Sequence, residues 1–111
     1  MKTERFNFNV LSTNQANKEV LVNENMNLLE RLIHMSAKST NAKNPPESPS
    51  YGDIYIILEE SEAWGETKNY IAIYIDEWIY IPPKTGMICW VEDLKKLHIF
   101  DGNNWFASHG L

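Results

Sequence analysis

The first third of the chain has the hydrophobic spacing of an amphipathic helix. Val22, Met26, Leu29 and Ile33 follow one another at intervals of four, three and four residues, which places them on one helical face. We call these four residues the helix stripe. Four further apolar residues widen the face: Leu21, Leu28, Leu32 and Met35.

The pattern predicts a helix over residues 13–36. Thr13 or Asn14 is the expected N-cap, and the helix is expected to start near Gln15. Two interpretations of the helix stripe stay open. It packs on the rest of the domain, or it is also the interface between copies of the chain.

A proline-rich segment follows the helix. Pro45, Pro46 and Pro49 exclude a helix or a central strand there, because proline lacks the backbone N–H and has a fixed φ. We predict a connector over residues 37–50 between the helix and a sheet.

Residues 51–111 alternate short apolar or aromatic runs with turn signals, which is typical of an antiparallel β-meander. The six expected strands lie within residues 53–58, 70–75, 78–81, 87–91, 97–100 and 105–108. Asp76 and Glu77 predict a hairpin, and the absence of glycine leaves a longer or bulged turn open. The fold class is therefore α+β in a single domain over residues 1–111, and barrel-like curling of the sheet stays open.

Composition and charge exclude several classes of function. The chain has 111 residues, and its 10 Lys+Arg against 15 Asp+Glu give a net charge of −5. This argues against a nucleic-acid binder and against a polybasic membrane-surface protein. We expect neither a signal peptide nor a membrane span. One cysteine and three histidines show no metal-ligand spacing, so we expect no metal and no cofactor.

The nucleophiles and bases do not form a catalytic pattern. Cys89 stands in an apolar run, where cysteine is usually a small core residue. His98 alternates with two apolar neighbours and is expected to face solvent. His34 ends the helix, and His109 lies in the C-terminal tail. We assign no catalytic residue.

Tryptophans and carboxylates make a candidate glycan site. Sugar rings stack on exposed aromatic side chains, and Trp64 lies in a loop beside Glu62 and Glu66. Trp78 and Trp105 follow turns rich in Asp and Asn and complete the candidate set. The alternative is that these tryptophans are core residues, which we favour for Trp78 and Trp105 and leave open for Trp64.

Two further expectations concern the same side chains. Trp90, inside an apolar strand, is expected in the core. Glu59 and Glu60 extend the acidic loop, whose carboxylates form a solvated surface, a weak cation site or a glycosidase pair.

The order of several motifs covers residues 14–105. It runs from Gln15–Val20 and Asn23–Leu29, through Pro45–Asp53, to Trp64-Gly65, Trp78–Pro82, Trp90-Val91 and Asp101–Trp105. In this order the chain resembles a domain-of-unknown-function family of bacterial phage, prophage and gene-transfer-agent proteins of the tail-fibre type. The loop around Trp64 is shorter and more acidic than in that family.

The resemblance implies a virion or tail-associated role without established catalytic residues. The leading hypothesis is a non-enzymatic structural module for assembly or host-surface attachment, located in the virion or in the cytoplasm before assembly. Its expected partners are copies of itself, preferably in a homotrimer, other virion or tail proteins, or a cell-surface glycan. The alternatives are a free carbohydrate-binding module and a small hydrolase acting on cell-surface glycans.

Overall fold

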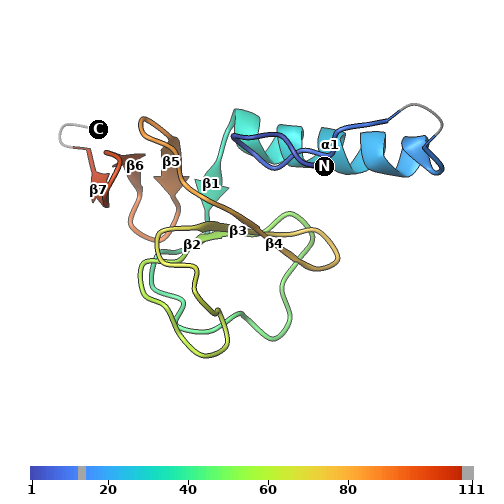
Figure 1. Cartoon of the computed structure of the whole chain (residues 1–111). Helices are drawn as coiled ribbons and strands as arrows, with labels where there is room; N and C mark the ends of the chain where they lie inside the picture. Colours follow the sequence, from blue (N-terminus) through green and yellow to red (C-terminus); the bar gives the residue numbers. More distant parts are fainter. Residues whose placement is uncertain (13–14, 109–111) are drawn as a thin grey trace. The chain divides into compact units, whose positions relative to one another are not determined.

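The computed structural model describes residues 1–12 and 15–108. In these residues one helix is followed by seven strands in two sheets (Figure 1). The chain divides into two compact units, Met1–His34 and Met35–Leu111, which we describe separately. The expected α+β class is confirmed, and the single domain over residues 1–111 stays a prediction.

The first unit contains helix α1, Lys18–Ile33. The helix begins later than expected, after Asn17 in the left-handed conformation (φ 58°), whose side chain makes no capping hydrogen bond. The N-caps expected at Thr13 or Asn14 lie outside the described residues. His34 is the C-cap, so the helix ends before residue 36.

An N-terminal segment pairs with α1 through two asparagines. The backbone N–H of Asn9 donates to Asn25 Oδ1 at 2.7 Å, and Asn25 Nδ2 donates to the carbonyl of Asn9 at 2.9 Å. The Asn25 amide thus satisfies the backbone groups of Asn9 as a neighbouring strand would. Hydrophobic spacing carries no signal for this contact.

The second unit contains a three-stranded antiparallel sheet in the order β2 (Ile54–Ile56), β3 (Ile71–Tyr74), β4 (Trp78–Ile81). The register aligns isoleucines across all three strands and places them on one face. They are Ile54, Ile56, Ile71, Ile73, Ile79 and Ile81. The opposite face carries Tyr55, Ala72 and Tyr80 in the same register.

The other sheet has the order β1 (Ser36–Ala37), β5 (Ile88–Val91), β6 (Lys96–Phe100), β7 (Trp105–Ala107). Strand β1 pairs parallel to β5, and the other neighbours are antiparallel. All six expected strands are present. Pro82-Pro83 follow β4 and interrupt the meander, so the described strands form two sheets and no closed barrel.

The connector expected over residues 37–50 is structured at its start, which corrects its boundary. Ala37 is fully buried, and its carbonyl accepts a hydrogen bond from Glu92 N–H at 2.8 Å. Lys38 N–H donates to the carbonyl of Ile54 at 2.7 Å. Residues 36–39 therefore pair with both sheets. A two-residue strand is too short to show a period in the sequence.

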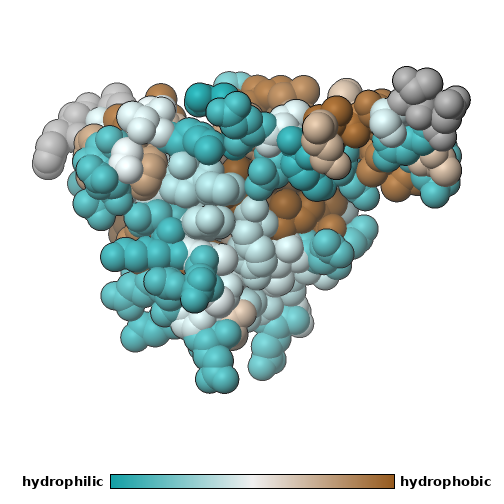
Figure 2. Space-filling model, in the orientation of Figure 1, coloured by the Kyte–Doolittle hydropathy of each residue, from teal (hydrophilic) through white to brown (hydrophobic). Residues whose placement is uncertain are grey.

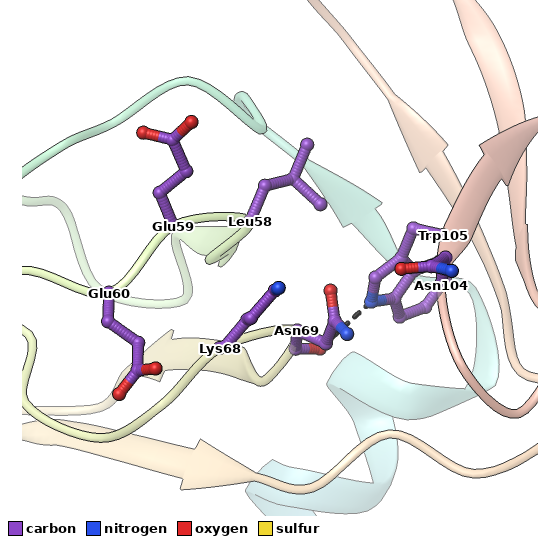
Figure 3. Close-up of a pocket in the computed structure, with 7 residues that line it drawn as sticks. All are labelled: Leu58, Glu59, Glu60, Lys68, Asn69, Asn104 and Trp105. Atoms are coloured by element: carbon purple, nitrogen blue, oxygen red, sulfur yellow. Dashed lines mark hydrogen bonds between the residues drawn. The ribbon is translucent and has the colours of Figure 1, made fainter.

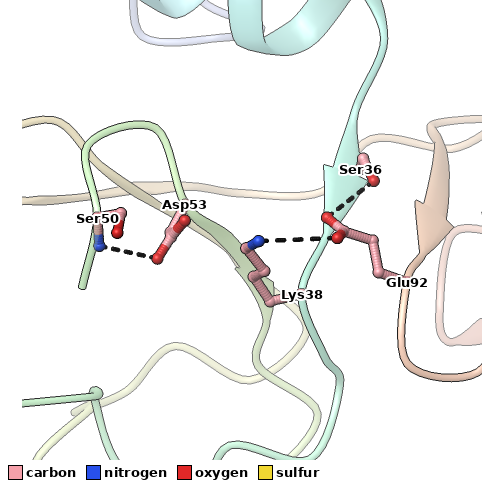
Figure 4. Close-up of polar contacts among 5 residues, drawn as sticks. All are labelled: Ser36, Lys38, Ser50, Asp53 and Glu92. Carbon is pink, nitrogen blue, oxygen red and sulfur yellow. Dashed lines mark hydrogen bonds and ion pairs between the residues drawn. The ribbon is translucent and has the colours of Figure 1, made fainter. Parts of the chain in front are cut away.

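Side chains add to this junction (Figure 4). Ser36 Oγ donates to Glu92 Oε2 at 3.0 Å, and Lys38 Nζ lies 3.7 Å from Glu92 Oε1. In the same view, Ser50 N–H donates to Asp53 Oδ2 at 2.9 Å, just before β2. The ion pair is solvent-exposed, so it contributes at most about 1 kcal/mol; the backbone pairing is the stronger constraint.

Candidate functional site

Trp64 lies in an aromatic cluster on the face of the three-stranded sheet that carries Tyr55, Ala72 and Tyr80. Its side chain is only 3% exposed, and Nε1–H donates to the carbonyl of Ala42 at 2.9 Å. Its ring meets the rings of Trp78 and Tyr80 edge-on, at centroid distances of 5.3 and 6.1 Å. Trp64 thus has no free ring face, and of the two alternatives that the sequence left open for it, the structure shows the core residue.

Trp78 is the centre of the same cluster and is partly buried. Tyr55 and Tyr74 also meet it edge-on, at 5.9 and 5.2 Å. Desolvation raises the pKa of Tyr55, with a smaller contribution from the Asp53 carboxylate, and desolvation also raises the pKa of Tyr80. The cluster is a packed structure rather than an open binding platform.

Trp105 is buried, as its core interpretation expected. Its ring packs on Phe100 at a centroid distance of 5.4 Å, and its Nε1–H donates to the carbonyl of Asn69 at 2.8 Å. This hydrogen bond joins β7 of one sheet to the β2–β3 loop of the other. It also places one edge of the indole beside a surface depression.

The inter-sheet depression has a volume of about 510 Å³ (Figure 3). The β2–β3 loop contributes Leu58, Glu59, Glu60, Lys68 and Asn69, and the other sheet contributes Asn104 and Trp105. Of the residues predicted for a glycan site, only Trp105 lines it. Sequence reasoning identified the acidic loop but selected Glu62 and Glu66, which are exposed outside the depression.

Asn69 fixes the position of the β2–β3 loop relative to the β6–β7 turn, the two segments that border the depression. It adopts the left-handed conformation at φ 71°, which asparagine tolerates well. Its N–H donates to the carbonyl of Ile57, and its Nδ2 donates to the carbonyl of Asn103 at 3.0 Å. Together with the Trp105 hydrogen bond, these contacts hold the loop against the β6–β7 turn.

The β6–β7 turn is itself held by a side chain. Asp101 Oδ1 accepts hydrogen bonds from the backbone N–H groups of Asn103 at 2.8 Å and Asn104 at 2.7 Å. These bonds lower the pKa of Asp101, and the bond from Asn104 contributes more than the bond from Asn103. The turn signal at residues 101–104 is therefore confirmed, and it positions Asn104 at the depression.

A smaller depression of about 190 Å³ adjoins the first. Residues 40–43 line one side of it, and Leu58 and Glu59 line both depressions. The β2–β3 loop therefore has a hollow on each side of Leu58.

The four-stranded sheet has an exposed apolar face, which we call the outer sheet face. Ile88, Trp90 and Phe106 are 52%, 38% and 47% exposed. The register places Ile99 between Ile88 and Phe106, and Leu97 opposite Trp90. The expectation that Trp90 is a core residue is wrong, because alternation along β5 turns Cys89 and Val91 inward instead.

The same alternation corrects His98. It is only 6% exposed, and it pairs with Cys89 and Ala107 in the register. Its Nδ1 lies 3.2 Å from the carbonyl of Lys96. The expected two-fold alternation is correct, but the inward side of β6 is the side of His98 and Phe100. Because β6 has apolar residues on both sides, the sequence does not indicate which side faces inward.

Cys89 is fully buried, as expected for a core residue. Burial raises the pKa of its thiol to about 12. Since the thiolate is the nucleophilic form, the side chain is protonated and inert at neutral pH.

The helix stripe is exposed at all four positions. Val22, Met26, Leu29 and Ile33 are between 43% and 62% exposed, whereas Leu28 on the flank is buried. Brown hydrophobic surface is visible along α1 in Figure 2, and the loops beside the three-stranded sheet are hydrophilic. The stripe therefore is available as an apolar surface.

Comparison with known proteins places the chain in a family. A family model described as a protein of unknown function, DUF2793, matches residues 22–106. The chain belongs to DUF2793. The match runs from the helix stripe to β7 and so includes the inter-sheet depression and the outer sheet face. No curated protein and no solved structure matches the chain.

Two other kinds of site are absent from the described residues of this DUF2793 chain. Within residues 1–12 and 15–108, no three His, Cys, Asp or Glu side chains are grouped so that they could hold a metal ion. In the same part of the chain, α1 is neither long nor apolar enough to cross a membrane. His109 lies outside the described residues.

Proposed function

We propose that the chain is a non-enzymatic structural module of a phage or prophage-derived virion, of the tail-fibre type. It serves assembly or host-surface attachment and self-associates, with a trimer as the preferred state. The observation that carries the assembly role is the outer sheet face. The virion context rests on the resemblance of the motif order.

The outer sheet face has the composition of an interface core. Ile88, Trp90 and Phe106 stand exposed on adjacent strands, with Leu97 and Ile99 between them. Full burial of one such side chain is worth about 1.5–3 kcal/mol. A contiguous apolar patch on a soluble domain typically marks an interaction site, and tryptophan is enriched among the residues that dominate binding energy.

A second copy of the chain is the occupant that fits best. The net charge of −5 gives copies no mutual charge attraction, so apolar burial has to drive association. Each copy carries two apolar surfaces, the outer sheet face and the helix stripe. A closed symmetric oligomer buries the same surfaces in every subunit, so it can cover the exposed apolar surfaces of all copies at once.

The test is the solution mass by light scattering on a sizing column over a concentration series. We expect a mass of three chains of 12.9 kDa for the natural protein. The double variant Ile88→Thr/Phe106→Thr should lower the mass, because threonine keeps β-propensity and removes apolar area. Leu94→Thr is the matched control, since Leu94 is 46% exposed in the β5–β6 turn, outside the sheet face.

The outcomes separate the two surfaces. Loss of mass in the double variant, with Leu94→Thr unchanged, supports the outer sheet face as the interface. Loss of mass only in Met26→Gln moves the interface to the helix stripe. A monomer at every concentration rejects self-assembly. Mass spectrometry of purified phage particles from the strain that carries the gene tests the virion location separately.

A further inference from the structure

We propose that the inter-sheet depression binds a neutral saccharide. This inference concerns residues other than the two apolar surfaces, so it stands independently of self-assembly. It also moves the expected glycan site from Trp64, Glu62 and Glu66 to a different part of the same loop.

The side chains around the depression are free to bind a ligand. Glu59 and Glu60 offer acceptors, Lys68 offers a donor, and the Asn104 amide offers both. Within the described residues, none of these four side chains forms a hydrogen bond or an ion pair. The backbone amides of residues 58–60 are also unpaired there. The depression therefore presents unused donors and acceptors of both kinds on one concave surface.

The site is also pre-organised. The Asn69 side chain and the Trp105 indole each donate a hydrogen bond across the depression, to Asn103 and to Asn69 respectively. In Figure 3, the Asn104 and Trp105 side chains come from the β6–β7 side of the depression, and Lys68 extends from the loop on the other side. A rigid frame lowers the entropy that ligand binding would otherwise lose.

The mixture of groups favours a saccharide. Sugar hydroxyls both donate and accept, which matches the carboxylates and the ammonium group of the β2–β3 loop and the Asn104 amide opposite them. Leu58 and the edge of Trp105 provide apolar contact for C–H groups. The volume of about 510 Å³ lies in the range of small-ligand sites. Glu59, Glu60 and Lys68 together carry one net negative charge, which disfavours phosphate ligands.

The test is an NMR titration of the ¹⁵N-labelled full chain with maltotriose, chitotriose and lactose. Each is added to about 10 mM, tenfold above a Kd of about 1 mM. We expect saturable shifts of the amides of residues 58–60, 68–69 and 103–105. Asn104→Ala and Lys68→Met should each weaken binding about three- to tenfold, as the loss of one hydrogen bond predicts.

Glu62→Gln and Glu66→Gln are the matched controls, since both residues lie in the same loop outside the depression. Their affinities should equal that of the natural chain. Absence of saturable shifts with all three sugars overturns the proposal. Equal losses of sugar affinity in the control variants also overturn it. Binding of trilysine without binding of any sugar overturns it in favour of a basic peptide ligand. Repeating the titration with Ile88→Thr/Phe106→Thr separates sugar binding from assembly.

Discussion

The four tryptophans look alike in the sequence but have different roles in the structure. Trp64 and Trp105 are buried, and each donates its N–H to a backbone carbonyl. Trp78 is partly buried and so more exposed than either, and Trp90 is exposed on the outer sheet face. Burial therefore separates two structural anchors from one side chain that is available to a partner.

This difference predicts unequal losses of stability. Trp64→Ala should lower the free energy of unfolding by about 3–5 kcal/mol, because it leaves a cavity and an unpaired Ala42 carbonyl. Trp90→Ala should cost less than about 1 kcal/mol, as for other exposed positions. Urea unfolding at low protein concentration, where association is minimal, measures both. Equal losses would contradict the observed burial.

Cys89 predicts a pH dependence of stability. Its folded pKa of about 12 lies above the ordinary value of 9.0, so the unfolded chain loses this proton first. The stability from the buried neutral thiol is complete below pH 9 and is lost as pH rises toward 12. The stability of the natural chain should therefore fall more steeply above pH 9 than that of Cys89→Ala.

Urea midpoints of both proteins at pH 7, 9 and 10 provide the measurement. Tyr55 and Tyr80 also have raised pKa values, but they are present in both proteins and cancel in the comparison. Parallel pH profiles of the two proteins would show that Cys89 titrates normally.

At the scale of elements, turns decide how the strands pair. The β3–β4 hairpin has no glycine, and Asp76 supplies the positive φ of 64° in a three-residue loop between Tyr74 and Trp78. This is the longer turn that the sequence left open. The β6–β7 turn uses Gly102 at φ 106° instead.

Substitution of Gly102 should lower the stability of the fold more than substitution of Gly65. A Cβ at this position would lie 2.9 Å from Thr85 Oγ1, whereas at Gly65 (φ 81°) it would meet nothing within 4 Å. Gly65→Ala should cost about 1–3 kcal/mol from backbone strain alone. Gly102→Ala should cost about 1 kcal/mol or more beyond that, from the added contact.

Thermal and urea unfolding of both variants give the comparison. Thr85→Ala in the Gly102→Ala background should restore the part due to the contact and leave the strain. If Thr85→Ala restores nothing, the contact with Thr85 is not the cause.

At the scale of the molecule, the apolar surfaces and the charge set the conditions for assembly. Copies with a net charge of −5 repel each other, and salt screens that repulsion. Association through the outer sheet face should therefore strengthen with salt, whereas association through charge pairs would weaken. Measuring the solution mass at low and high salt distinguishes the two mechanisms.

The sequence alone determined most of the elements of this protein, all but the two-residue strand β1. The 3.6-residue spacing of the helix stripe predicted α1, and β-branched and aromatic runs between turn signals predicted six strands. It also determined family membership and the turn at Asp101. These features depend on local spacing and on backbone preferences, which a linear pattern records.

The tertiary structure alone decided which faces are buried and which residues meet. Strands β5 and β6 have apolar residues on both sides, so alternation could not tell that His98 faces inward and Trp90 outward. The depression joins Asn69 to Asn104 across a long stretch of chain. Such contacts depend on how two sheets pair through β1 and Asn69, and no local pattern contains that information.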